Sequence, residues 1–222
     1  MLTMDELLRR LELFEGLDAK DSNSILRLAE LRSYSPNEDI VGEGQAGSHL
    51  FCVLTGLVRL TKRESSGREV DVCVCEPGDA FGEYLVPCED GSYEHGAKAA
   101  EFTEVVMFDL AGLRALANGR QAIQRNIMRI MARHLVGAFN CIAGDRLHTA
   151  AQRVANYFLS RCPATTSQVT FRLPYQKRVL AGKLGLAPEA LSRAFAALAE
   201  VGVDVRGRTV RIESMAMLRL AC

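Results

Sequence analysis

Residues 181–193, Ala-Gly-Lys-Leu-Gly-Leu-Ala-Pro-Glu-Ala-Leu-Ser-Arg, decide the fold of the C-terminal part of the chain. Apolar spacing predicts a short helix before Gly185 and a second helix that begins at Pro188, since proline is favoured at the first helical position. Small Ala181 lets two helices approach closely, Gly185 adopts the left-handed turn, and Leu191 fills the junction. The stretch therefore predicts a helix-turn-helix.

Three polar residues of the second helix, Glu189, Ser192 and Arg193, fall on the face opposite its apolar residues. An arginine fork matches the two acceptors that guanine presents in the major groove of DNA. A glutamate can accept from the amino group of cytosine, and a serine hydroxyl can contact either kind of base. We therefore expect these three side chains to contact bases.

A basic hairpin is predicted after the second helix. Valine and isoleucine alternate with polar residues over 203–212, around a tip that contains glycine, as in two antiparallel strands that form a wing. Arg206 and Arg208 flank that glycine and are expected to contact DNA phosphates, as are Lys177 and Arg178 in the first helix. For the helix-turn-helix itself, the alternative is an ordinary helical hairpin with a solvated face, which periodicity alone does not exclude.

The charges of the 222 residues are segregated although their formal sum is zero. Residues 1–118 carry 11 Lys and Arg against 22 Asp and Glu, whereas residues 148–222 carry 11 against 4. Residues 119–147 hold five Arg and one Asp. A basic C-terminal part favours a polyanionic partner, most simply double-stranded DNA; chance segregation of surface charge is the alternative.

Composition indicates a globular protein with no membrane segment. Hydrophobic residues make up 48% of the chain, but no apolar run approaches the roughly 20 residues of a membrane span. The first residues lack the basic-then-apolar order of a signal peptide, so a cytoplasmic location is expected. The seven Cys are an odd number without an export signal, so reduced thiols are expected.

The N-terminal part changes pattern at about residue 31. Helical periodicity precedes it, and residues 31–110 are short strand-like runs cut by glycine, as in an antiparallel sandwich or barrel. The fold class expected for the whole chain is α+β: an N-terminal antiparallel β-roll, a long dimerisation helix and a C-terminal winged helix-turn-helix. The domain boundaries expected are 1–118, 119–147 and 148–222, because Thr149 and Gln152 match a capping box at the start of a new helix.

The longest helical pattern, over about 110–147, has two apolar stripes, which is more than one partner surface requires. One stripe can pack on its own sheet domain while the other meets a second copy of the chain. A helix buried within a single domain is the alternative. The residues predicted at the dimer interface are Ile123, Ile127, Met131, Leu135 and Ile142.

These features together resemble the CRP/FNR superfamily of transcriptional regulators, and the resemblance covers nearly the whole chain. It rests on the glycine-punctuated sheet, on Pro77-Gly78-Asp79-Ala80-Phe81-Gly82-Glu83, on Met131-Ala132-Arg133-His134-Leu135 in the long helix, and on Glu189-Ala190-Leu191-Ser192-Arg193. The last motif is similar to that of the FNR-like members, and the chain looks most like their denitrification-regulator branch. The resemblance implies a homodimer bound to an inverted repeat of TTGAT-like half-sites, with RNA polymerase as a further partner.

The resemblance also implies an effector pocket formed by Gly82, Glu83, Tyr93, His95 and Phe139. Cyclic-nucleotide-binding members carry an Arg-Ser or Arg-Thr pair that neutralises the cyclic phosphate, where this chain has Tyr93-Glu94. Their adenine-facing Thr-Ser pair corresponds here to Ala138-Phe139. Cyclic AMP is therefore not expected to bind, because an acidic pocket without its arginine repels a phosphate.

The cofactor stays open at this point. An iron–sulfur cluster of the FNR type is not expected, because residues 1–51 contain no Cys. Haem that senses nitric oxide is the option the resemblance suggests, with His95 as candidate ligand, although each His is also explained as an ordinary polar residue. Cys73 and Cys75, with Cys52 and Cys88, are interpreted as buried apolar residues, and a metal or redox site is the alternative.

Two other classes of function fit the sequence less well. A cyclic-nucleotide-type module that acts through protein contacts keeps the N-terminal fold, but it has no use for Glu189, Ser192, Arg193 or a basic wing. An enzyme is not expected, since the sequence shows no nucleophile motif, no P-loop and no metal-spaced His and Cys set.

Overall fold

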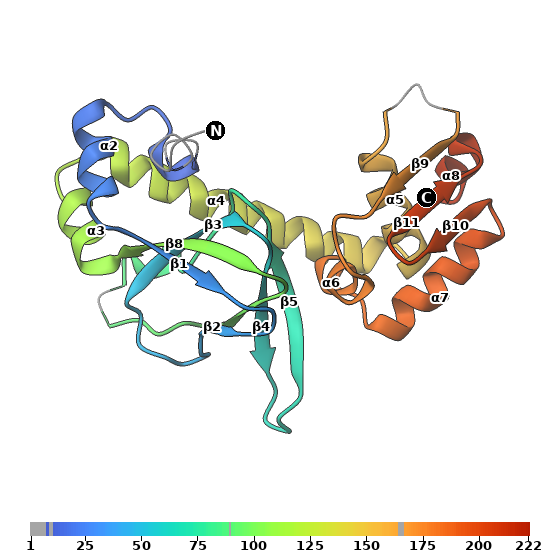
Figure 1. Cartoon of the computed structure of the whole chain (residues 1–222), viewed down its shortest axis with the longest axis horizontal. Helices are drawn as coiled ribbons and strands as arrows, with labels where there is room; N and C mark the ends of the chain where they lie inside the picture. The colour runs from blue at the N-terminus through green and yellow to red at the C-terminus, as the bar shows by residue number, and fades with distance from the viewer. Residues whose placement is uncertain (1–7, 9–10, 89, 164–166) are drawn as a thin grey trace. The chain divides into compact units, whose positions relative to one another are not determined.

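The computed structural model describes residue 8 and residues 11–88, 90–163 and 167–222 (Figure 1). The chain divides into two compact units, Met1–Gly137 and Ala138–Cys222. Each unit has its own buried apolar residues.

The first unit is built on two four-stranded antiparallel sheets, which confirms the predicted β-roll. The hairpin of β4 (Val58–Arg63) and β5 (Glu69–Cys75) turns at Gly67, whose φ of +85° is the left-handed conformation that a tight turn requires. Phe51 and Phe81 stack at 4.8 Å between ring centroids in the core. One sheet has the order β1 (Ala29–Tyr34), β8 (Thr103–Asp109), β3 (His49–Thr55), β6 (Ala80–Phe81), and the other β2 (Asp39–Val41), β7 (Gly96–Ala99), β4 (Val58–Arg63), β5 (Glu69–Cys75).

Helices accompany the sheets of this unit: η1 (Glu12–Phe14), α2 (Ala19–Leu26), η2 (Glu83–Leu85), α3 (Leu110–Ala117) and the first part of α4 (Gln121–Leu147). The single helical pattern expected from about residue 110 is broken between α3 and α4. Gly119 takes a φ of +79° there, and that conformation ends a helix. Asn126, completely buried on α4, donates to the carbonyl oxygens of Leu13 and Glu15, both at 2.9 Å, and so fastens η1 to α4.

The two apolar stripes of α4 have different surroundings. Ile123, Ile127 and Ile130 are buried in the core of the first unit, so the assignment of Ile123 and Ile127 to a dimer interface was wrong: they have no free surface to offer a second copy. Met131 is half-buried against the same core. Leu135 and Ile142 are 58% and 48% exposed. Of the two stripes, only the second one, which contains Leu135 and Ile142, is therefore available to another molecule.

The second unit contains the predicted winged helix-turn-helix. Its three-stranded antiparallel sheet has the order β10 (Val203–Arg206), β11 (Thr209–Ile212), β9 (Val169–Arg172). Thr149 and Gln152 form the predicted capping box at the start of α5. The elements of this unit after α4 are α5 (Ala150–Ser160), β9 (Val169–Arg172), α6 (Lys177–Lys183), α7 (Pro188–Ala199), β10 (Val203–Arg206), β11 (Thr209–Ile212) and α8 (Met215–Leu220).

The cysteines are only in part the buried apolar residues that the sequence predicts. Cys52 and Cys75 are buried, whereas Cys73 and Cys88 are exposed. Burial raises the pKa of the Cys52 thiol, and a hydrogen bond with Cys73 together with burial raises the pKa of Cys75. Among the described residues, no three His, Cys, Asp or Glu side chains are placed to hold a metal ion. Within that same part of the chain, no helix has the length and apolar character of a membrane span.

Candidate nucleic-acid interface and sensor cassette

The turn between α6 and α7 has the geometry that its sequence predicts. Gly185 has a φ of +61°, and the amide of Leu186 donates to the carbonyl of Ala181 at 2.8 Å. Pro188 then occupies the first turn of α7. Ala181 and Leu191 are 1% and 2% exposed, so together they fill the helix crossing.

The face of α7 away from this core carries the predicted base contacts. Glu189, Ser192 and Arg193 are all exposed, while the apolar side of the helix is buried. The Ser192 hydroxyl donates to the carbonyl of Pro188 at 3.0 Å. Its proton is therefore used within the helix, and its lone pairs are left to accept from a base amino group. The structure thus places all three residues side by side on one accessible helix face.

The N-terminal part of α6 presents two further basic side chains. Lys177 and Arg178 are both exposed. The Lys177 ammonium lies 5.2 Å from the ring centroid of Phe195, a cation–π contact that holds it beside α7. This position suits a phosphate contact next to the base-contacting face.

The two arginines of the wing do different things, although the sequence predicts the same role for both. Arg206 is 86% exposed and pairs with Asp204 at 2.8 Å on the surface. Arg208 is half-buried and donates from Nε to the carbonyl of Leu173 at 2.9 Å and from Nη2 to the carbonyl of Pro174. Its guanidinium therefore fastens the wing to the loop before α6.

This difference predicts different salt dependences. Arg206→Ala should weaken binding to every duplex similarly and reduce the slope of log affinity against log salt by about one per half-site. Arg208→Ala should leave that slope unchanged, because no phosphate contact is lost, and should lower the thermal stability of the second unit instead. Filter binding over a salt series, paired with thermal unfolding, measures both; equal slope changes in the two variants would contradict the assignment.

The end of α4 is fixed to the helix-turn-helix inside the second unit. Asp145 of α4 forms an ion pair with Arg153 of α5. A Cβ atom added at Gly185 would lie 3.5 Å from Nη1 of Arg153 and 3.6 Å from a carboxylate oxygen of Asp145. The turn before α7 is thus packed directly against this ion pair. The sequence offered no signal for it, because Gly185 is far along the chain from both Asp145 and Arg153.

In the first unit, Gly82 and Tyr93 shape the predicted effector cassette. Gly82 has a φ of +81°, and a Cβ atom there would lie 3.3 Å from the Tyr93 ring. Tyr93 is 2% exposed; its hydroxyl donates to the carbonyl of His49 at 2.8 Å and accepts from the amides of His49 and Ser48. Its polar group is therefore used within the fold rather than for a ligand.

Glu83, which follows Gly82, is held by a histidine that the sequence did not assign to this cassette. One Glu83 oxygen lies 2.7 Å from Nδ1 of His134 on α4, and Glu83 is 5% exposed. The hydrogen bond to Glu83 raises the pKa of His134, against the opposing effect of burial. Periodicity predicts that His134 lies on the long helix, but it does not tell which distant residue a helix face meets.

The remaining members of the predicted effector pocket, His95 and Phe139, are less well placed to bind an effector. His95 is half-buried, and burial, with a smaller contribution from nearby Lys62, lowers its pKa. Lys62 itself pairs with Glu43 at 3.0 Å and donates to the carbonyl of Glu94. Phe139 is 62% exposed on α4 and belongs to the second unit.

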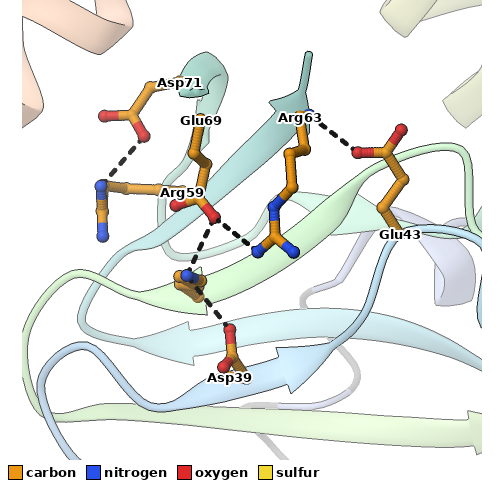
Figure 2. Close-up of polar contacts among 7 residues, drawn as sticks. Asp39, Glu43, Arg59, Arg63, Glu69 and Asp71 are labelled. Atoms are coloured by element: carbon orange, nitrogen blue, oxygen red, sulfur yellow. Dashed lines mark hydrogen bonds and ion pairs between the residues drawn. The ribbon is translucent and has the colours of Figure 1, made fainter. Parts of the chain in front are cut away.

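Lys98 is the other cation of this region, and it lies in a network of ion pairs that joins β2, β5 and β7. Its Nζ is 3.0 Å from Glu69 and 3.5 Å from Asp39. Arg59 and Asp71 of the same sheet form a separate ion pair, 2.9 Å between Nη1 and a carboxylate oxygen (Figure 2). A side chain engaged by two carboxylates is not free to neutralise a phosphate.

Comparison with known proteins fits both units. A family model described as the cyclic nucleotide-binding domain matches residues 31–120, and one described as the Crp-like helix-turn-helix domain matches residues 152–221. The crystal structure of a candidate cyclic nucleotide-binding protein from Ruegeria pomeroyi is 30% identical, with a TM-score of 0.65 and coverage of 97% of this chain and 95% of that one. The chain belongs to the CRP/FNR family of transcriptional regulators.

Other CRP/FNR relatives extend over most of the chain. The cyclic AMP receptor protein of Thermus thermophilus is 29% identical and aligns with 93% of this chain and 94% of its own. The structure of FixK2 from Bradyrhizobium japonicum is 28% identical, with a TM-score of 0.70 and coverage of 87% and 96%. Membership of this CRP/FNR family implies a DNA-binding, dimerising regulator.

Proposed function

We propose that this regulator binds an inverted repeat of TTGAT-like half-sites as a homodimer, with Glu189, Ser192 and Arg193 of each protomer contacting bases. The observation that carries the proposal is the exposure of all three side chains on one face of α7 while Leu191 and Leu198 on the other face are 2% exposed. A helix with this polarity, preceded by a tight turn and followed by a wing, can enter a major groove.

The proposed dimer forms through the second stripe of α4. Leu135, Phe139 and Ile142 are between 48% and 62% exposed and recur at spacings of three and four residues, as in a coiled-coil seam. An exposed apolar stripe of this length on a helix calls for an apolar partner. A second copy of α4 supplies one, and a twofold dimer matches a palindromic site.

The direct test compares a TTGAT palindrome with random duplex as salt rises. Non-specific binding is largely electrostatic and should fall away steeply with salt, whereas base contacts should maintain the preference for the palindrome. Fluorescence anisotropy at several salt concentrations measures both affinities. Loss of the preference at every salt concentration would leave the alternative proposal, a regulatory module that acts through protein contacts.

The effector proposed is a small molecule other than cyclic AMP, and nitric oxide bound through haem is the candidate, as in the denitrification-regulator branch. Some relatives are named for activation by cyclic AMP. Tyr93 occupies the position at which cyclic-nucleotide-binding members carry an arginine. Lys62 and Lys98 are both neutralised by carboxylates. RNA polymerase as a partner and a cytoplasmic location complete the proposal.

Cyclic AMP is therefore expected neither to bind nor to stabilise the protein. Calorimetry should give no heat of binding at millimolar nucleotide, and the thermal unfolding midpoint should stay constant, because Lys62 and Lys98 are already paired with carboxylates and are not free to hold the phosphate. A micromolar dissociation constant would contradict this. Stoichiometric haem uptake, with a Soret band that shifts on adding nitric oxide and weakens in His95→Ala, would support the haem candidate.

A further inference from the structure

The carboxylate of Glu83 is buried in the first unit, and burial of a charge costs free energy. Its side chain is 7% exposed, and it follows directly on the left-handed Gly82 at the start of η2. Only one of its two oxygens has a hydrogen-bond partner among the residues that the structure describes. A buried carboxylate with so little compensation depends strongly on the one partner it has.

That partner, His134, lies at the boundary between the buried and the exposed part of α4. It follows Ile130, which is 1% exposed in the core of the first unit, and immediately precedes Leu135, which is 58% exposed. The contact between His134 and Glu83 therefore marks the end of the part of α4 that packs on its own sheets. Beyond it begins the stripe assigned above to the dimer.

The other charged and titratable groups around this pair do not replace His134. Arg133 of α4 turns to Glu12 at 2.8 Å and Asp79 at 3.9 Å. Cys73, and the buried Cys52 and Cys75, approach from the strands. These thiols bring no positive charge. The imidazole of His134 is thus the group in direct contact with Glu83 that can take up a positive charge.

We propose that Glu83 and His134 form a proton-operated clasp that fastens α4 to the β-roll and regulates DNA binding by this protein. When His134 is protonated, its charge compensates the buried carboxylate and the clasp is closed. When His134 is neutral, it can still donate one hydrogen bond, but Glu83 keeps an uncompensated buried charge. The clasp then opens more readily.

The direction of the pH dependence follows from the pKa of His134, which the hydrogen bond to Glu83 raises above the ordinary value of about 6.5. Below that ordinary value the clasp contributes its full stabilisation. The stabilisation is lost as pH rises through the raised pKa. Weaker attachment of α4 loosens the dimer stripe that follows, and this last step rests on the proposed function.

Proton NMR of the histidine ring signals tests the clasp without any DNA. His134, assigned by its absence in His134→Gln, should titrate above the ordinary histidine value in the full-length protein and move back down in Glu83→Gln. His148→Gln, at an exposed histidine just beyond α4, should leave the His134 titration unchanged. A His134 signal that titrates at or below the ordinary value in the wild type would overturn the proposal.

Palindrome affinity at pH 6 and pH 8 tests the regulatory step. The palindrome affinity of the wild type and of His148→Gln should fall about fivefold or more from pH 6 to pH 8. The affinity of His134→Gln should change less over the same range, because glutamine keeps a hydrogen bond to Glu83 without titrating. If all three proteins show the same pH dependence, the clasp does not regulate binding. If no variant prefers the palindrome at either pH, the proposed function fails, while the NMR titration still decides whether the clasp exists.

Discussion

Arg193→Ala should remove the preference for guanine at one base pair of each half-site and weaken binding to the palindrome. Arg193 is exposed on α7 one turn beyond Glu189, where its fork can engage the two acceptors of a guanine in each half-site. Loss of a bidentate base contact costs about 1–3 kcal/mol. Two half-sites make this about 2–6 kcal/mol, or roughly 30-fold to 20,000-fold in palindrome affinity.

The measurement for Arg193 is a comparison of affinities for the palindrome, for the palindrome substituted at one base pair per half-site, and for random duplex. The variant should bind the first two alike and keep most of its affinity for random duplex. Arg206→Ala is the matched control, since it removes the same charge from an exposed wing position and should weaken all three duplexes equally. If Arg193→Ala weakened random duplex as much as the palindrome, the residue would be a phosphate anchor.

Leu135→Glu should dissociate the dimer. Leu135 is 58% exposed in a single protomer, so glutamate there does not disturb the core of the first unit. In the paired stripe it would bury an uncompensated carboxylate opposite its own copy, at a cost of about 3–5 kcal/mol. Sedimentation at micromolar concentration should show monomers, and palindrome affinity should fall to the level of a single half-site.

Asn140→Glu is the control for the dimer prediction. It adds the same charge to an exposed residue of α4 that the helical repeat places away from the Leu135 and Ile142 stripe. This variant should remain dimeric. If the wild type itself sedimented only as a monomer at micromolar concentration, the premise for palindromic binding would be lost.

The C-terminal unit was predictable from sequence because its determinants are local. Gly185 and Pro188 act through backbone geometry, and both take the conformations that the turn requires. Thr149 and Gln152 are within one helical turn of each other and form the predicted capping box. Strand alternation over a few residues likewise indicated β10 and β11. In each case the signal and the structure lie within the same short stretch of chain.

The tertiary structure decided the features in which distant residues meet. The sequence showed two apolar stripes on α4, but only packing on the β-roll revealed that Ile123 and Ile127 are buried by their own protomer. Nothing near Arg208 in sequence distinguishes it from Arg206; its hydrogen bonds reach residues 34 and 35 positions away. The Glu83–His134 contact spans 51 positions. Periodicity fixes which face of an element is apolar or charged, whereas the partner of that face depends on how the whole chain packs.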